Sequence, residues 1–111
     1  MLKELTPQTK TRMVEFNTSN VCNLKCVTCV RNWEEYKQPD PIYLSLANFA
    51  IALNRFSDLE IVQFCGFSEP TLNNELPEMI KFSKAAGVGH VEMFTNGTRL
   101  VGDMAKRISQ S

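Results

Sequence analysis

Three of the four cysteines lie close together in the segment Cys22-Asn-Leu-Lys-Cys26-Val-Thr-Cys29. Iron–sulfur clusters are bound by thiolates, and ligands that are close in sequence cost little loop entropy to gather. A four-iron cluster has four ligand positions, so three cysteines leave one iron open, as in a catalytic metal site. The spacing therefore predicts a four-iron, four-sulfur (4Fe-4S) cluster with one open iron.

Three other interpretations of these cysteines remain open. Zinc prefers four ligands, and the next donors, Cys65 and His90, lie on separate predicted strands. Cys26 and Cys29 alone form a CxxC redox motif, which leaves Cys22 without a role. Chance clustering of buried thiols fits poorly with a polar loop. A cluster explains all three residues and is the favoured interpretation.

Hydrophobic periodicity predicts strands and helices that alternate along the chain. The segment around the cysteines, 19–41, reads as a long loop with a helical turn near residues 31–36. Ser45 is a good N-cap for the first helix, and Gly87 is a natural end for the second. The predicted strands are residues 12–18, 60–65 and 90–95, and the predicted helices are residues 45–56, 74–86 and 100–108.

The order βαβαβα predicts an α/β fold with a parallel sheet and right-handed crossovers. In such sheets, binding sites form in the loops at the carboxyl ends of the strands. The loops in this position carry the cysteines, the segment Gly66-Phe-Ser-Glu-Pro70, and the segment Thr95-Asn-Gly-Thr98. We therefore expect all three loops to meet at one edge of the sheet.

The cysteine loop, with Asn-Val before Cys22, resembles the signature of the radical SAM superfamily. The resemblance implies that Cys22, Cys26 and Cys29 bind a 4Fe-4S cluster whose open iron chelates S-adenosylmethionine. Reductive cleavage of S-adenosylmethionine then gives a 5′-deoxyadenosyl radical, which abstracts hydrogen from a substrate. The position before the third cysteine is usually aromatic and packs near adenine, and here it is Thr28.

The other two loops also resemble segments of this family. Gly66-Phe67-Ser68-Glu69 is similar to its Gly-Gly-Glu-Pro loop, which implies that Glu69 and this backbone hold the methionyl amino group. A positive φ at Ser68 would cost about 1 kcal/mol or more. Thr-Asn-Gly is common in the third loop, which implies that Asn96 contacts S-adenosylmethionine. Ordinary structural turns remain the alternative for both loops.

The family core is a partial, TIM-like barrel of six βα units. Residues 12–111 are expected to form a parallel half-barrel, (βα)3, after a lead-in at residues 1–11. An open parallel edge would make the isolated chain associate or be marginally stable. The other half of the barrel is expected as a continuation of the chain or as a partner chain, unless the sequence is a degenerate gene product. The motifs look most like the branch with molybdenum-cofactor biosynthesis enzymes and SPASM peptide maturases. The resemblance implies a flavodoxin-like or ferredoxin-like electron donor and an unidentified small molecule or peptide as substrate. A non-catalytic iron–sulfur or metal-binding module is the alternative function.

The composition excludes some classes of function. Twelve basic residues balance twelve acidic ones, so nothing indicates nucleic-acid binding. The sequence shows no apolar stretch of about 20 residues and no secretory signal, so a cytoplasmic, membrane-free protein is expected. Several side chains are expected to have structural roles. Cys65 ends a strand, where it faces a barrel interior or, as we favour, is a small buried hydrophobe. His90 is expected to be structural or solvated, and Glu15 and Glu92 to face either a barrel interior or solvent. Residues 31–37 are expected to be mostly solvated surface, with Arg31 close enough to the cluster to meet a carboxylate.

Overall fold

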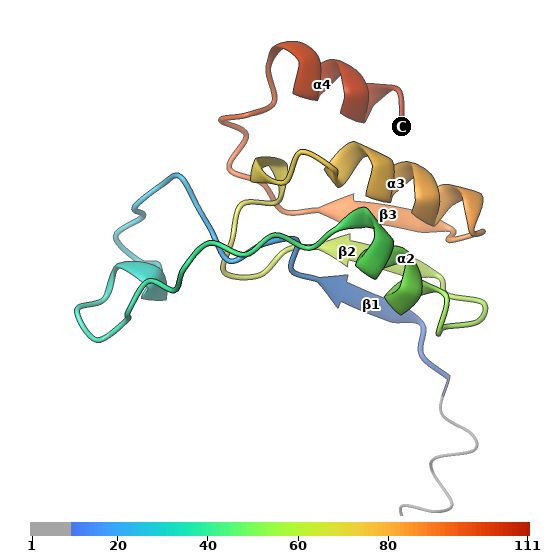
Figure 1. Cartoon of the computed structure of the whole chain (residues 1–111), viewed down its shortest axis with the longest axis horizontal. Helices are drawn as coiled ribbons and strands as arrows, with labels where there is room; N and C mark the ends of the chain where they lie inside the picture. The colour runs from blue at the N-terminus through green and yellow to red at the C-terminus, as the bar shows by residue number, and fades with distance from the viewer. Residues whose placement is uncertain (1–9) are drawn as a thin grey trace, which may run out of the picture.

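Three parallel strands and three α-helices alternate along the chain in a computed structural model that describes residues 10–111 (Figure 1). Most of the predicted lead-in, residues 1–9, lies outside the described residues. The predicted order βαβαβα is confirmed. The elements are β1 (Met13–Phe16), the 3-10 helix η2 (Val30–Asn32), α2 (Leu46–Leu53), β2 (Ile61–Phe64), the 3-10 helix η3 (Pro70–Leu72), α3 (Leu76–Ala85), β3 (His90–Met93) and α4 (Gly102–Ser109).

The strands form one sheet in the order β1-β2-β3, with both pairs parallel. The register places Val14 beside Val62 and Val62 beside Val91, and one residue further along it aligns Glu15, Gln63 and Glu92. Side chains alternate between the two faces of a strand. One face of the sheet therefore carries an apolar row, and the opposite face carries a polar row.

The hydrophobic core lies between the apolar face of the sheet and helices α2 and α3, which lie on the same side of the sheet (Figure 1). Phe49 of α2 is at its centre and is fully buried. Its ring lies 4.7 Å from that of Phe16, 5.7 Å from that of Phe64 and 6.3 Å from that of Phe82, between ring centroids. Phe49 thus joins the predicted first helix to two strands and to α3.

The first strand is shorter than predicted and ends at Phe16 instead of residue 18. The carbonyl of Phe16 still accepts from Cys65 N, but the carbonyl of Thr18 accepts from Leu44 N and from Asn73 Nδ2. The chain therefore leaves the sheet after Phe16 to pair with other loops. The sequence does not reveal this change of hydrogen-bond partner, because the alternation of side chains that predicts the strand continues through Thr18.

The helices also begin or end at other residues than predicted. Helix α2 ends at Leu53, since a tight turn follows it in which Phe56 N donates to the carbonyl of Leu53. Helix α3 begins at Leu76 instead of residue 74, because Asn73 Oδ1 accepts from Glu75 N and holds the preceding residues in a turn. Helix α4 begins at Gly102, and Val101 is 67% exposed instead of belonging to its apolar stripe.

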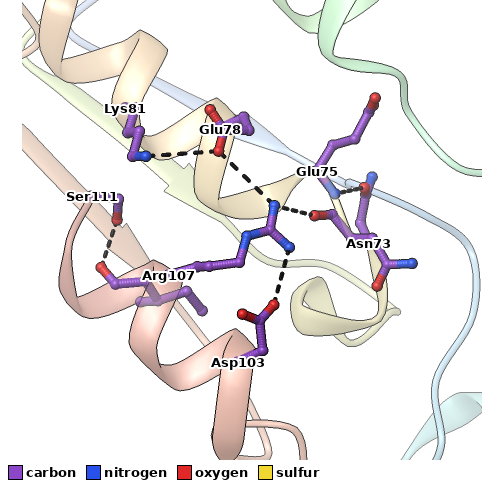
Figure 2. Close-up of polar contacts among 9 residues, drawn as sticks. Asn73, Glu75, Glu78, Lys81, Asp103, Arg107 and Ser111 are labelled. Carbon is purple, nitrogen blue, oxygen red and sulfur yellow. Dashed lines mark hydrogen bonds and ion pairs between the residues drawn. The ribbon is translucent and has the colours of Figure 1, made fainter.

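Helix α4 is attached to α3 by polar contacts and by a few apolar side chains. Arg107 Nη2 donates to the carbonyl of Asn74 at 3.1 Å, and Arg107 lies 3.9 Å from both Glu78 and Asp103 (Figure 2). Exposed ion pairs contribute only about 0–1 kcal/mol. Burial of Met104 therefore contributes more than these contacts to the position of the helix. Within residues 10–111, no helix is both long and apolar enough to cross a membrane.

Replacing Phe49 with Ala should lower the free energy of unfolding by about 3–5 kcal/mol, because it leaves a cavity among the aromatic rings of the core. Urea denaturation followed by circular dichroism measures this loss. Ile51→Ala is the matched control on the same helix, since Ile51 is 59% exposed and its truncation should change stability by less than about 0.5 kcal/mol. Equal losses in the two variants would contradict the placement of the core.

Candidate functional site

The loops after the three strands lie at the same edge of the sheet, and hydrogen bonds join them. The cysteine loop extends beyond the carboxyl ends of the strands (Figure 1). Glu69 N donates to the carbonyl of Val21 at 2.9 Å, which joins the second loop to the first. Asn23 Nδ2 donates to Thr98 Oγ1 at 2.8 Å, and Asn96 Nδ2 donates to Asn23 Oδ1 at 2.9 Å, which joins the first loop to the third. The expected meeting of the three loops is confirmed.

The carboxylate of Glu69 is buried where the second and third loops meet. The residue is 2% exposed. Its Oε1 accepts from Thr95 Oγ1 at 2.5 Å and from Asn96 N at 2.6 Å. Its Oε2 accepts from Thr71 Oγ1 at 3.1 Å and Thr71 N at 3.4 Å, and from Thr95 Oγ1 at 2.8 Å. A carboxylate has about four lone-pair positions, so protein donors occupy them all.

The three loop cysteines are free thiols on one segment outside the sheet. Cys26 is exposed, and Cys22 and Cys29 are half-buried. Cys29 N donates to the carbonyl of Cys26 at 3.0 Å, and Asn32 Nδ2 donates to the same carbonyl at 2.8 Å, so a tight turn separates these two residues. Among residues 10–111, no three Cys, His, Asp or Glu side chains are gathered where they would hold one metal ion.

Three thiols on one accessible loop fit an iron–sulfur cluster by their chemistry, but their present positions do not form a binding site. Metal binding and local folding are coupled, so the ligands of a metal-free chain need not already have the bound arrangement. Binding of one cluster by Cys22, Cys26 and Cys29 would require their thiols to come closer together. The 3-10 helix η2, which begins directly after Cys29, replaces the longer helical turn predicted at residues 31–36.

The residues expected around S-adenosylmethionine differ in exposure. Thr28 and Phe67 are exposed, with Phe67 at 63%. Gly66 has φ +120°, and a Cβ there would overlap the side-chain amide of Asn17, so only glycine fits. Ser68 does not have a positive φ, so the anticipated strain at this position is absent. Its hydroxyl oxygen is buried and has no hydrogen-bond partner among the described residues.

The second face of the sheet, which α2 and α3 leave uncovered, carries Cys65 together with polar side chains. Cys65 is half-buried instead of fully buried, and its thiol donates to Gln63 Oε1 at 3.3 Å. Burial, followed by the nearby carboxylates of Glu15 and Glu92, raises the pKa of the Cys65 thiol to about 11. The prediction that Cys65 is a buried apolar residue is therefore wrong. His90 is exposed, in agreement with a structural or solvated role.

Sequence reasoning missed two residues that organise this edge. The sequence predicts no role for Thr95 beyond its place in a turn motif, yet its hydroxyl contacts both carboxylate oxygens of Glu69. Arg31 is expected in a mostly solvated charged run, close enough to the cluster to meet a carboxylate, yet it is 8% exposed and donates to two backbone carbonyls and to Gln38. Asn96, the second residue of the same motif and a predicted ligand contact, gave a partial signal for Thr95. Nothing in the composition of the charged run separates Arg31 from its exposed neighbours.

A hollow of about 370 Å³ lies beside the start of the cysteine loop. Its lining does not include Glu69, Asn96 or the cysteines. The hollow lies instead between the segment leaving β1 and the segment entering α2. It is lined by Asn17, Ser19, Asn20, Ile42, Tyr43, Leu44 and Asn48.

Comparison with known proteins finds several enzymes that resemble this chain. A 7,8-dihydro-6-hydroxymethylpterin dimethyltransferase of Methanocaldococcus jannaschii is 32% identical over 92 residues, 81% of this chain and 18% of its own length. A tungsten-containing aldehyde ferredoxin oxidoreductase cofactor-modifying protein of Pyrococcus furiosus is 28% identical, over 80% of this chain and 25% of its own. A GTP 3′,8-cyclase of Pasteurella multocida is 26% identical, over 83% of this chain and 28% of its own length. No protein-family model matches the chain.

These matches support the resemblance to the radical SAM superfamily at a general level. A match over four-fifths of 111 residues spans Cys26, Cys29 and Glu69 wherever it begins. The chain spans only about a fifth to a quarter of the length of the curated relatives it matches. Their names denote enzymes with different substrates.

Glu69→Gln should loosen the contact between the second and third loops. The NH2 group of the new side chain would face hydrogen-bond donors, from which it cannot accept. One buried polar group left unsatisfied costs about 1–3 kcal/mol. Urea denaturation should show a loss of this size, and hydrogen exchange should be faster at the Asn96 amide. Glu35→Gln removes an exposed carboxylate and should change neither measurement. Unaltered exchange at Asn96 in Glu69→Gln would show that this carboxylate does not hold the third loop.

The Cys65 thiol should react slowly with iodoacetamide at neutral pH. Its pKa of about 11, against an ordinary value of 9.0, lowers the thiolate fraction at pH 8 by about 100-fold. The test uses a variant with Ser at Cys22, Cys26 and Cys29, so that Cys65 is the only thiol left in the chain. The rate should rise with pH up to about 11, and Glu15→Gln should make the reaction faster at pH 8. A rate that levels off near pH 9 would contradict the raised pKa.

Proposed function

We propose that this chain is the cluster-binding and S-adenosylmethionine-binding part of a radical SAM enzyme. The observation that carries the proposal is the direct bonding of the cysteine loop to both other loops at the carboxyl edge of a parallel sheet. The Glu69 amide contacts the carbonyl of Val21, and Asn96 contacts Asn23. Ligands for one cofactor have to surround it from neighbouring loops, and this edge is where α/β folds place them.

Cys22, Cys26 and Cys29 would bind a 4Fe-4S cluster through their thiolates. When bound, such a cluster supplies an electron and an open iron for reductive cleavage of S-adenosylmethionine to a 5′-deoxyadenosyl radical. Cys26 is exposed and Cys22 and Cys29 are half-buried, so the thiols would be accessible to iron and sulfide. Their position beyond the sheet keeps the thiols away from the hydrophobic core.

Glu69 would act mainly by holding the second and third loops at a fixed separation. Its carboxylate is already filled by Thr71, Thr95 and Asn96, so direct contact with an amino group requires one of these donors to leave. The backbone of Gly66 and the unpartnered hydroxyl of Ser68 lie on the same loop and would complete the binding site. A buried hydroxyl without a partner is unfavourable in the free protein and would be satisfied by a polar ligand.

Phe67 and Thr28, which are both exposed, would cover an aromatic group of the bound ligand. Asn96 would contact the ligand only by giving up its bond to Asn23. We propose that the uncovered polar face of the sheet, with Glu15, Gln63 and Glu92, looks toward the substrate. The relatives differ in substrate, so no particular substrate is proposed.

The cluster has to be reduced before S-adenosylmethionine is cleaved, and we propose that a separate protein delivers the electron. A flavodoxin-like or ferredoxin-like donor would reduce the cluster. The matched relatives are about four or five times longer than the matched region, which supports a requirement for more of the barrel. Both outer strands of the described sheet, β1 and β3, pair on one side only, so each is able to accept a further strand.

Anaerobic reconstitution with iron and sulfide tests the proposal. About four irons per chain are expected, since three thiolates hold a 4Fe-4S cluster, and reduction in the presence of S-adenosylmethionine should release 5′-deoxyadenosine. Ala at Cys22, Cys26 or Cys29 should abolish iron binding. Cys65→Ala is the matched control and should retain the full iron content, because this thiol lies on the sheet.

The outcomes separate the candidate functions. A cluster without 5′-deoxyadenosine release, even when a protein that completes the barrel is added, would support a non-catalytic iron–sulfur module. Binding of one zinc ion and no iron would rule out the radical SAM assignment. Loss of iron in Cys65→Ala would show that the ligand set is wrong.

A further inference from the structure

The side chain of Arg31 is the least expected feature of the cysteine loop. It lies two residues after Cys29, within a charged stretch, and is 8% exposed. Its Nη1 donates to the carbonyls of Asn20 at 2.9 Å and Phe67 at 2.8 Å. Its Nη2 donates to Gln38 Oε1 at 2.6 Å. The guanidinium therefore contacts both ends of the cysteine loop and the loop after β2.

Two further contacts hold this guanidinium in place. Gln38 Nε2 donates back to the carbonyl of Arg31 at 2.7 Å, so the two residues bind each other reciprocally. The ring of Tyr36 lies 5.7 Å from the Arg31 guanidinium carbon, within the range of a cation–π contact. Such an arrangement uses the planar, multiple-donor geometry of arginine, which a lysine cannot reproduce.

The charge of Arg31 is not balanced by the protein that surrounds it. Its hydrogen-bond partners are two carbonyls and one amide oxygen, all neutral. Within residues 10–111, no carboxylate lies at ion-pair distance from it. Burying a charge without a counter-charge is unfavourable. A compensating anion nearby would remove this cost.

We propose that Arg31 is a positioning residue that anchors the cysteine loop to the loop after β2 and provides the positive charge that favours an anionic thiolate–metal centre. The anchoring follows from contacts in the described chain. The identity of the anion rests on the function proposed above, because thiolates at Cys22, Cys26 and Cys29 bring negative charge to the same loop. Arg31 does not touch the ligand in this assignment.

Hydrogen exchange of the metal-free protein tests the anchoring. In Arg31→Gln, amides of residues 20–38 and of Glu69 should exchange about 5–30-fold faster, the factor that corresponds to a loss of 1–2 kcal/mol. Arg31→Lys should fall between this variant and the unaltered protein. Arg55→Gln is the control, because Arg55 is exposed at the end of α2. Unchanged exchange in both Arg31 variants would overturn the anchoring. Where Arg31→Gln fails to fold, Gln38→Ala removes one contact of the guanidinium and should raise exchange over the same residues.

Redox titration of the iron-loaded protein tests the charge. Removing a positive charge makes it harder to add an electron, so the midpoint potential of Arg31→Gln should shift to more negative values, and that of Arg31→Lys should stay near the unaltered protein. A purely structural role would not shift the potential of a fully loaded variant. Full iron content with an unchanged potential in Arg31→Gln would overturn the electrostatic role. Failure of the unaltered protein to bind iron would refute the proposed function, and the exchange measurement would still decide the anchoring.

Discussion

The buried carboxylate of Glu69 is the interaction on which the arrangement of the loops depends. It accepts hydrogen bonds from Thr71 within its own loop and from Thr95 and Asn96 in the next loop, while its backbone amide binds the start of the cysteine loop. A fully buried acidic group is tolerated only when its hydrogen-bonding positions are filled. Thr71, Thr95 and Asn96 are therefore tied to each other through one side chain. Loss of any of them would leave the others around an unsatisfied carboxylate.

Arg31 performs a similar role on the other side of the cysteine loop, with the opposite charge. Glu69 has donors for every lone pair, whereas Arg31 has only neutral acceptors and no carboxylate at ion-pair distance in the described chain. The acidic residue is thus electrostatically satisfied without a ligand, and the basic residue is not. This difference indicates that the edge between the loops is suited to an anionic group on the cysteine side.

The two faces of the sheet differ in composition. The apolar row that contains Val62 packs under the helices, and the polar row with Gln63 and the Cys65 thiol faces the uncovered side. Because alternate residues of a strand point to opposite faces, the same short strands carry both rows. The open conformation of the cysteine loop is compatible with this division, since closing it around a metal need not disturb the aromatic core.

Much of the fold could be predicted from local patterns. The apolar periodicity of residues 46–53 and 76–80, the Ser45 cap and the βαβαβα order are local properties, and they determined the parallel topology and the edge where the loops meet. Element ends were predicted less well. At Thr18 and Asn73, hydrogen bonds between distant segments replaced the continuation of a strand or a helix. Sequence patterns within one element contain no information about those distant partners.

For the site, the sequence by itself determined which residue types were available: three clustered cysteines, a Gly-Phe-Ser-Glu loop and a Thr-Asn-Gly turn. Only the tertiary structure decided how they are used. In the folded chain, protein donors bind the carboxylate of Glu69, and Ser68 has no positive φ. Cys65 lies on a polar face of the sheet, and Arg31 is buried. The physical reason is that burial and hydrogen-bond saturation depend on other loops of the chain, such as Thr95 for Glu69 and Phe67 for Arg31. These loops meet only when parallel strands bring their carboxyl ends to one edge.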